Sequence, residues 1–355
     1  MAARRPRVLY LLQEYPQVSE TYIANELEVL WPSCDIHIVA RTNASASYRD
    51  HFPFTVIPRE ERAALQALAG EFRPDIVHAH YLHNAVTAHN LAARLGAAFT
   101  VRLHSFDVLA PRPEALRMAV TAINSPVCAG ALTFPFTVER MLAAGVDAAK
   151  LHAAPPVLRI DRFLDRGPNG KAIMNTGAAL PKKNMEAFID LAAAMPSRRF
   201  NLYAMGYDVS ALKDYNQSRG GRVNLVRPVE PRAMPAEYKK HEWLVYTASP
   251  AINTVGWPMA IAEAQASGVG VLMQDIRPDL RDWVGPAGYL FRTIEEAAAI
   301  IQRPLPAERR EAGFEHARSW DFYRHMATLV RLWSAALSRP RQAAPAPGST
   351  RTSQS

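Results

Sequence analysis

The segment DIVHAHYLHNAVTAHNLAARLGAAFTVRLH, residues 75–104, holds a complete strand–helix–strand pattern. Short apolar runs at 75–80 and 99–104 flank a stretch of helical periodicity at 84–95. The runs are nearly unbroken rather than alternating, which is typical of parallel strands covered by helices on both faces. Two such strands joined by a helix form a βαβ unit, so the segment predicts a doubly wound parallel α/β sheet.

The same alternation extends in both directions along the chain. The other elements predicted for the first half are strands at 7–12, 36–40 and 54–57 and helices at 20–30, 60–71 and 112–121. Residues 150–170 carry three prolines and two glycines, as expected of an interdomain connection. The pattern then restarts with strands at 172–177, 200–206, 223–226, 243–248 and 269–274 and helices at 184–195, 209–217, 233–240, 258–267 and 319–337.

We therefore expect two Rossmann-like domains of the α/β class, covering residues 1–160 and 161–318. The amphipathic helix, taken as 319–338, is expected to pack back on the N-terminal domain. The tail at 339–355 is rich in Pro, Ser and Ala and is expected to be disordered. Ligands of such sheets bind beyond the carboxyl ends of the strands, so the loops that follow the strands are the candidate sites.

The composition is that of a globular protein. The chain has 355 residues, of which 49% are hydrophobic and 21% charged, and this length favours two domains. Two cysteines, Cys34 and Cys128, are too few for a disulfide framework or a Cys-based zinc cluster. No stretch approaches the roughly 20 apolar residues of a membrane span, and VLYLL near the start is too short for a signal peptide. We expect a soluble, cytoplasmic protein.

The net charge of +8 arises in the second half of the chain. Residues 1–165 contain 16 Lys and Arg against 16 Asp and Glu, whereas residues 166–355 contain 25 against 17. This surplus suits a diphosphate ligand, an anionic membrane surface or nucleic acid, or it is a solvated basic face. No nucleic-acid motif accompanies it, so nucleic acid is not expected as a partner.

The first loop, in EYPQVSETYIANEL (14–27), has the pattern of a helix start. Ser19 can cap the helix, Glu20 suits its positive end, and Val18 with Ile23 can form a hydrophobic staple. Capping alone accounts for the segment. The functional alternative is that Ser19, Glu20 and Thr21 face an acceptor or a donor phosphate.

Several histidines follow the strands of the first half. His78, His80 and His83 invite a metal interpretation, but no acidic or thiol residue lies nearby in sequence, so we expect no metal. His104 ends an apolar strand and begins the loop HSFD with Asp107. A histidine at such a place is either a satisfied core group or a ligand-facing residue, and we favour the second.

Lys183 lies in the loop PKKN, directly before a predicted helix. The helix macrodipole repels a cation at this end, so a lysine here indicates an anionic partner such as a diphosphate. We expect Lys182 to be its solvated neighbour.

Glu263 is the only charged residue between Ala251 and Gln274. It lies in a small, apolar helix that Pro258 can begin at the first position. An unpaired buried carboxylate is costly, so Glu263 needs hydrogen-bond donors. Ribose hydroxyls would supply them, and the alternative is an ion pair with Arg277 or Arg281.

Four segments together resemble a known family. They are EYPQVSETYIANEL (14–27), RPDIVHAH with VRLHSFDV (73–80 and 101–108), TGAALPKKNMEAFIDLA (176–192) and VGWPMAIAEAQASGVGV (255–271). In this order and spacing they resemble the family 4 glycosyltransferases, which are retaining enzymes of the GT-B architecture, and look closest to members of bacterial polysaccharide assembly. The resemblance covers about residues 7–335.

The resemblance implies a metal-independent, retaining hexosyltransferase that needs no cofactor. The donor is a nucleoside-diphosphate sugar bound by the C-terminal domain, and the acceptor is a sugar, a lipid-linked sugar or a small molecule, with peripheral membrane contact. The product belongs to polysaccharide, glycolipid or natural-product glycoside biosynthesis. By resemblance, Lys183 contacts the diphosphate, Glu263 the ribose and His104 the transferred sugar, in a cleft between the domains.

The remaining predicted site residues are of two kinds. Those expected to bind the donor are Gly177, Lys182, Gly206, Val255, Gly256 and Trp257, and those expected on the acceptor side are Ser19, Glu20, Thr21, His80 and Asp107. For Trp257, core packing is the equal alternative.

Two positions depart from the family pattern. Ala178 replaces an arginine and Val255 replaces a glutamate, so one phosphate clamp and one acceptor of sugar hydrogen bonds are missing. Asn253 or Thr254 can supply some of the lost polar contacts. The alternative function is therefore a degenerate relative that binds a nucleotide or a partner without transfer. A sugar epimerase or phosphorylase of the same architecture explains fewer of the four segments.

Overall fold

The computed structural model describes residues 4–17, 19–43, 51–206 and 208–339. Its contacts divide the chain into two units. The first contains Met1–Pro16, Leu27–Ala154 and Met326–Ser355, and the second contains Gln17–Glu26 and Pro155–His325. Two helices, α1 (Thr21–Leu30) and α14 (Phe322–Leu337), run across the boundary between the units.

The first unit is built on a seven-stranded sheet in the order β3-β2-β1-β4-β5-β6-β7. Every neighbouring pair is parallel. The strands are β1 (Arg7–Glu14), β2 (Asp35–Thr42), β3 (Phe54–Val56), β4 (Ile76–His80), β5 (Ala98–Arg102), β6 (Cys128–Thr133) and β7 (Leu151–Ala153). The helices between them are α2 (Arg62–Phe72), α3 (Ala85–Leu95), α4 (Ser105–Leu109), α5 (Pro113–Ile123) and α6 (Val138–Ala143).

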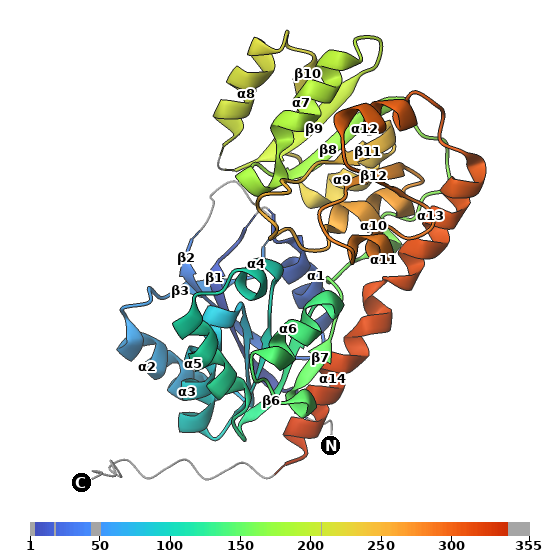
Figure 1. Ribbon diagram of the computed structural model, residues 1–355. Helices are drawn as coiled ribbons and strands as arrows, with labels where there is room; N and C mark the ends of the chain where they lie inside the picture. The colour runs from blue at the N-terminus through green and yellow to red at the C-terminus, as the bar shows by residue number, and fades with distance from the viewer. Residues whose placement is uncertain (1–3, 18, 44–50, 207, 340–355) are drawn as a thin grey trace. The chain divides into compact units, whose positions relative to one another are not determined.

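The two faces of this sheet are covered by different helices (Figure 1). Leu9, Val77 and Val101 point into a core with α2, α3 and α5. The alternate residues face the other way, where Trp333 of α14 packs on His78 with ring centroids 5.6 Å apart. Trp333 Nε1 also donates to Thr100 Oγ1 over 3.0 Å. Burial on both faces explains why these strands are unbroken apolar runs in the sequence.

The second unit is built on a six-stranded sheet in the order β10-β9-β8-β11-β12-β13, again with parallel pairs throughout. Its strands are β8 (Ala172–Ala178), β9 (Phe200–Met205), β10 (Val223–Leu225), β11 (His241–Tyr246), β12 (Gly270–Gln274) and β13 (Tyr289–Phe291). Its helices are α7 (Met185–Ala194), α8 (Val209–Ser218), α9 (Met234–Tyr238), α10 (Met259–Ala266), α11 (Leu280–Val284), α12 (Ile294–Ile301) and α13 (Ala307–Ser319).

Both sheets are doubly wound. The chain begins each sheet in the middle, builds outward on one side, and then crosses over to build the other side. The direction reverses between β1 and β4 in the first sheet and between β8 and β11 in the second. Ligands of this fold bind where the strand order reverses, outside the carboxyl ends of the strands. The predicted pair of Rossmann-like parallel sheets is confirmed.

Most predicted elements occur within a few residues of their expected bounds, but three regions differ. The sequence pattern did not reveal β6, α6 and β7, nor the elements from α11 to α13. The helix predicted at 319–337 is α14, which begins three residues later than expected, at Phe322, because α13 extends to Ser319. Pro258 precedes α10 rather than occupying its first position. The predicted disordered tail falls almost wholly on residues outside the described part of the chain.

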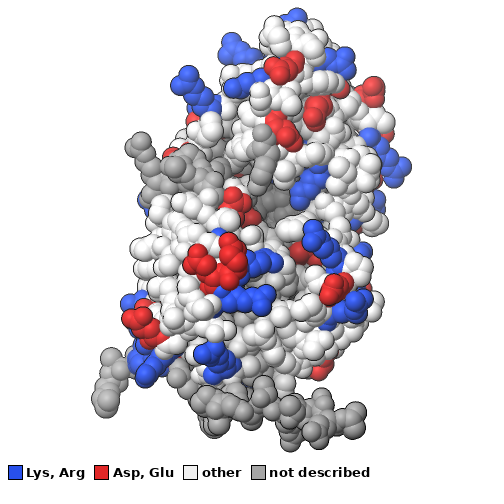
Figure 2. Space-filling view, turned by 90° about the vertical axis from the view of Figure 1, so that its left-hand side faces the viewer, with Lys and Arg blue, Asp and Glu red and all other residues white. Residues whose placement is uncertain are grey.

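One face of the molecule carries charges of both signs (Figure 2). On the face drawn in Figure 2, Lys and Arg are interspersed with Asp and Glu. Within the described ranges, no helix has the length and apolar character to cross a bilayer.

Candidate functional site

In the first unit, His80 and His104 meet beyond the carboxyl ends of neighbouring strands. His80 is the last residue of β4, and His104 follows β5 and precedes α4. His80 Nδ1 lies 3.1 Å from His104 Nε2, and the two rings stack with centroids 5.3 Å apart. His104 is only 8% exposed. The strand-end positions predicted from sequence are therefore brought together at the carboxyl ends of β4 and β5, next to the strand-order reversal between β1 and β4.

Asp107 braces the loops that carry these histidines. Its Oδ1 accepts a hydrogen bond from the backbone N–H of His104 at 2.9 Å, and its Oδ2 accepts one from the backbone N–H of Leu82 at 2.5 Å. Burial raises the pKa of Asp107 to about 7, although the backbone hydrogen bonds oppose this shift. Both oxygens of this predicted acceptor-side residue thus bind backbone, so the structure gives it a positioning role.

Tyr81 is a residue of this cluster that the sequence did not reveal. Its backbone lies at φ 74° and ψ 141°, which is a costly conformation for a bulky side chain. Its ring centroid is 4.3 Å from that of His104 and 5.5 Å from that of Phe106. The Asp107 bond to the next residue, Leu82, helps to hold this strained backbone. A tyrosine after a strand carries no signal of positive φ in the sequence.

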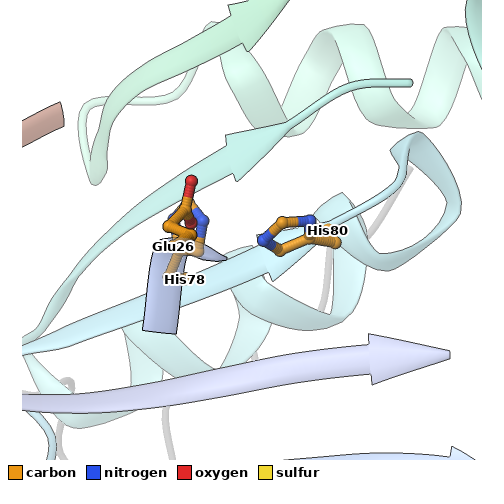
Figure 3. Close-up of side chains that lie close together, drawn as sticks. All are labelled: Glu26, His78 and His80. Atoms are coloured by element: carbon orange, nitrogen blue, oxygen red, sulfur yellow. The ribbon is translucent and has the colours of Figure 1, made fainter. Parts of the chain in front are cut away.

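The other two histidines are His78, within β4, and His83, in the turn that follows it. His78 and His80 lie on the same side of β4, as strand alternation predicts, and Figure 3 shows both; Glu26, the third residue labelled there, comes from α1. His78 Nδ1 is 2.7 Å from Thr100 Oγ1. Burial lowers the pKa of His83 to about 4, so its imidazole is uncharged at neutral pH. The expectation of no metal stays a prediction.

The first loop, after β1, is grouped with the second unit. α1 begins at Thr21, so Glu20 rather than Ser19 directly precedes the helix, and Ser19 is exposed. Thr21 Oγ1 lies 3.8 Å from Met259 Sδ at the start of α10. Val18, and with it the predicted staple, lies outside the described residues. The loop therefore lies beside the helix that carries Glu263.

Lys183 lies after β8, in a turn of 3₁₀ helix that directly precedes α7. Its Nζ is 5.4 Å from the centroid of the Tyr246 ring and packs against Gly177, where an added Cβ would come within 2.2 Å of it. Thr247 Oγ1 donates to the Lys183 carbonyl over 2.9 Å. Burial lowers the pKa of Lys183 to about 8. In the described ranges no carboxylate pairs with this ammonium group.

Lys182 differs from its expected role as a solvated neighbour. Burial, together with the charge of Lys183, lowers its pKa to about 8. Its carbonyl accepts a hydrogen bond from Ser249 N at 2.9 Å. Both lysines are therefore held by the loop after β11. Two partly buried lysines therefore follow the same strand.

The two predicted glycines have different surroundings. Gly177, in β8, has a φ of +138° and no room for a side chain, because Lys183 occupies the adjacent space. Gly206 follows β9 with a φ of +73° and is exposed, and a Cβ added to it would have no atom within 4 Å. At position 177 a side chain would collide with Lys183, so only glycine fits there. At position 206 there is room for a side chain, and glycine is favoured only by the positive φ.

Glu263, on α10, receives a hydrogen bond that the sequence did not predict. Tyr238 Oη donates to Glu263 Oε2 over 2.9 Å. Burial raises the pKa of Glu263 to about 7, against the opposing effect of this bond. The predicted alternative, an ion pair with an arginine, is wrong for Arg277, which instead binds Asp279 through Nε and Nη2 at 2.7 and 3.0 Å. No feature of the sequence marks Tyr238, which ends a five-residue helix.

The segment before α10 is buried and held by hydrogen bonds and ring stacking. Val255 is 3% exposed, and its carbonyl accepts a hydrogen bond from Arg277 Nη1. Trp257 is 5% exposed, stacks on Trp283 at 5.0 Å, and donates from Nε1 to Asp279 Oδ2 over 2.8 Å. The structure therefore shows the core-packing alternative for Trp257. Gly256 lies between these two buried residues and is itself half-buried.

Lys183 and Glu263 flank the strand-order reversal of the second sheet. Lys183 follows β8, and the helix of Glu263 follows β11, which is the neighbour of β8. The loops after these strands are joined, since Thr247 accepts a hydrogen bond from Asn175 Nδ2 at 3.0 Å and donates one to Lys183. A cation and a hydrogen-bond acceptor at such a point suit a ligand that carries phosphate and hydroxyl groups.

Comparisons with known proteins agree with this architecture. No protein-family model matches the chain. No curated protein matches it by sequence. Among solved structures, Anabaena Alr3699/HepE in complex with UDP-glucose superposes with a TM-score of 0.75 at 17% identity, covering 93% of this chain and 99% of that one.

Two further structures superpose over similar lengths. Sucrose-phosphate synthase from Thermosynechococcus elongatus has a TM-score of 0.72 at 15% identity, covering 93% of this chain and 99% of that chain. The lipopolysaccharide outer core galactosyltransferase WaaB, in its apo form, has a TM-score of 0.64 at 14% identity with the same coverage. At these identities the likeness concerns the fold, and the chain has the GT-B fold of these glycosyltransferases.

Proposed function

We propose that this chain is a glycosyltransferase that moves a sugar from a nucleoside-diphosphate sugar to an acceptor. The observation that carries the proposal is the ammonium group of Lys183, which is partly buried at the strand-order reversal of the second sheet without a carboxylate partner among the described residues. Removing a cation from water is unfavourable unless an anion compensates it. A diphosphate would stabilise the charged form of Lys183 and would also lie near the start of α7.

The proposed roles follow the chemistry of each group. Lys183, with Lys182 and the backbone near Gly177, Gly206 and Gly256, would neutralise the departing diphosphate. Glu263 would accept hydrogen bonds from the ribose hydroxyls. His104 would orient the transferred sugar or its acceptor, held by His80 and by the brace at Asp107.

The reaction itself is a substitution at the anomeric carbon. The bond from this carbon to the diphosphate oxygen breaks, a bond to an acceptor hydroxyl oxygen forms, and the proton of that hydroxyl passes to the departing phosphate or to water. Retention of configuration, independence of metal ions and membership of glycosyltransferase family 4 are parts of the proposal that rest on the four sequence segments.

The acceptor is proposed to be a sugar, a lipid-linked sugar or a small molecule. Polysaccharide assembly is the favoured context, because the segments resemble enzymes of that process. Two of the structures that share this fold are complexes of Alr3699/HepE, one with UDP-glucose and one with UDP and glucose. A peripheral contact with an anionic membrane is also proposed, supported by the basic surplus in residues 166–355.

A thermal-shift screen against UDP, GDP, dTDP, ADP and CMP tests the donor site. A ligand at a hundredfold excess over Kd should stabilise the protein by about 2.7 kcal/mol. We expect one nucleoside diphosphate to stabilise the wild type, and Lys183→Ala and Glu263→Ala to reduce this stabilisation. Lys213→Ala, which changes an exposed lysine of α8, is the matched control. Equal stabilisation of all four proteins would contradict the assignment of Lys183 and Glu263.

One observation favours a second function, that of a nucleotide- or partner-binding protein without transfer. Position 255, where the resembling family has a glutamate, is a valine that is 3% exposed. Ala178, in place of the family's arginine, is 4% exposed. Neither side chain offers a polar group. Nucleotide binding without transfer or donor hydrolysis, over a panel of UDP-, GDP-, dTDP- and ADP-sugars, would support this alternative.

A further inference from the structure

Tyr238 holds Glu263 from the interior of the second unit. This tyrosine is fully buried as the last residue of α9, and its ring packs edge-on against Phe163 with centroids 5.6 Å apart. Its Oη donates to Glu263 Oε2 over 2.9 Å. Because packing fixes the ring, the hydroxyl is a fixed anchor for one carboxylate oxygen.

The second oxygen of Glu263 is left for another partner. Glu263 is half-buried, whereas its neighbours Ala262 and Ala264 are almost completely buried. Among the described residues the hydrogen bond of Glu263 is made by Oε2, and Oε1 is not one of the fully buried atoms that lack a partner, so Oε1 has some exposed surface. A carboxylate with one oxygen anchored and the other accessible has a defined direction in which it can accept hydrogen bonds.

We propose that Tyr238 is a positioning residue of the donor site: its hydroxyl fixes the Glu263 carboxylate so that Oε1 is presented to the ribose hydroxyls of the nucleotide. This inference rests on the proposed function, in which Glu263 binds the ribose. It adds a residue from a different element, 25 positions before Glu263 in the chain, that contacts no ligand itself.

The neighbouring residue on α9 provides a matched control. Glu237 Oε2 accepts a hydrogen bond from Tyr203 Oη over 2.9 Å, and the same carboxylate binds Lys240 Nζ at 2.7 Å. This second tyrosine–glutamate pair has the same hydrogen-bond length and lies in the same unit. Neither Tyr203 nor Glu237 has a role in the proposed donor site, so loss of the Tyr203 hydroxyl tests the effect of losing such a pair in general.

The experiment compares Tyr238→Phe with Tyr203→Phe by calorimetric titration with UDP and with inorganic pyrophosphate, which lacks ribose. We expect Tyr238→Phe to weaken UDP binding about tenfold, the effect of one hydrogen bond to a charged group. Pyrophosphate affinity should stay at the wild-type value, because the diphosphate contacts are unchanged. Tyr203→Phe should leave both affinities unchanged.

A double-mutant cycle separates positioning from general damage. In a Glu263→Ala background, Tyr238→Phe should cause little further loss of UDP affinity, because no carboxylate is left for the hydroxyl to position. An equal loss of UDP and pyrophosphate affinity, or fully additive effects in the cycle, would overturn the inference. If Tyr238→Phe binds UDP as tightly as the wild type does, the inference fails but the proposed function stands. If the wild type binds no nucleoside diphosphate, the proposed function fails as well.

Discussion

Both units place polar groups near the carboxyl ends of their strands, but these groups have different kinds of partner. In the first unit, both oxygens of Asp107 bind backbone N–H groups, and His80 pairs with His104. In the second unit, Lys183 has no carboxylate partner among the described residues, and Glu263 is anchored through one oxygen. A site whose groups satisfy one another is preorganised to orient a substrate. A site with unused charge needs a ligand of complementary charge.

The largest expected effect comes from filling the space beside Lys183. In Gly177→Ala, the new Cβ would lie 2.2 Å from Nζ, so the ammonium group must move. We expect nucleoside-diphosphate affinity to fall tenfold to a hundredfold, roughly the strength of one or two hydrogen bonds to a charged group. Isothermal titration with UDP measures it.

Gly220→Ala is the control for backbone strain in Gly177→Ala. Gly220 also has a positive φ, of +87°, but no atom lies within 4 Å of the added Cβ. It should lower stability by about 1 kcal/mol without changing nucleotide affinity. If Gly177→Ala bound UDP as tightly as Gly220→Ala does, the site of the second unit would not depend on the placement of Lys183.

A smaller effect is expected at the brace of the first unit. Asp107→Asn replaces one acceptor oxygen with an N–H donor opposite a backbone N–H, which should lower the free energy of unfolding by about 1–3 kcal/mol. The nucleotide-induced shift in melting temperature should be unchanged, because the proposed donor site belongs to the second unit. If Asp107→Asn were as stable as the wild type but bound no nucleotide, Asp107 would affect nucleotide binding directly, contrary to this prediction.

The same variant should alter the pH dependence of stability. The pKa of Asp107 is raised on folding, to about 7, so its folded form holds a proton that the unfolded form has lost. Its contribution is therefore fully present below about pH 4 and is lost as pH rises through 7. Urea unfolding between pH 4 and 8 should show a shallower decline in Asp107→Asn than in the wild type. The pKa of Glu263 is also raised, so this residue causes part of the loss of stability with rising pH in both proteins.

The smallest effect is expected at Trp257. Trp257→Phe removes the hydrogen bond to Asp279 and part of the stacking on Trp283. Stability should fall by about 1 kcal/mol, and UDP affinity should not change, because the indole is core packing. Titration and thermal unfolding of the same sample measure both quantities. A large loss of UDP affinity at unchanged stability would show that Trp257 binds the donor.

Local patterns in the sequence predicted much of this fold because the strands are buried on both faces. Runs such as 75–80 must be apolar throughout, and the helices between them must be amphipathic, so each element leaves its own signal. The elements between 275 and 318 left a weaker signal. β13 has three residues, and α13 has charged residues around most of its circumference, so neither shows a clear period.

Single residues of the site could be predicted only where chemistry made them conspicuous. Lys183 at a helix start and Glu263 in an otherwise uncharged helix both conflict with their local surroundings, and that conflict is visible in the sequence. Tyr238 and Tyr81 suit their neighbours in the sequence, so nothing there marks them. Their roles come from a hydrogen bond 25 residues away and from a backbone angle, neither of which a residue type encodes.

The sequence by itself determined the class of fold, the division into two α/β halves, and the placing of charged groups at strand ends. These features follow from burial and periodicity, which act along the chain. Only the tertiary structure decided which partners those groups have: Tyr238 rather than an arginine for Glu263, backbone for Asp107, and an aromatic ring with a glycine for Lys183. Partners are decided by packing between distant segments, and a hydrogen bond formed across such a distance leaves no period in the sequence.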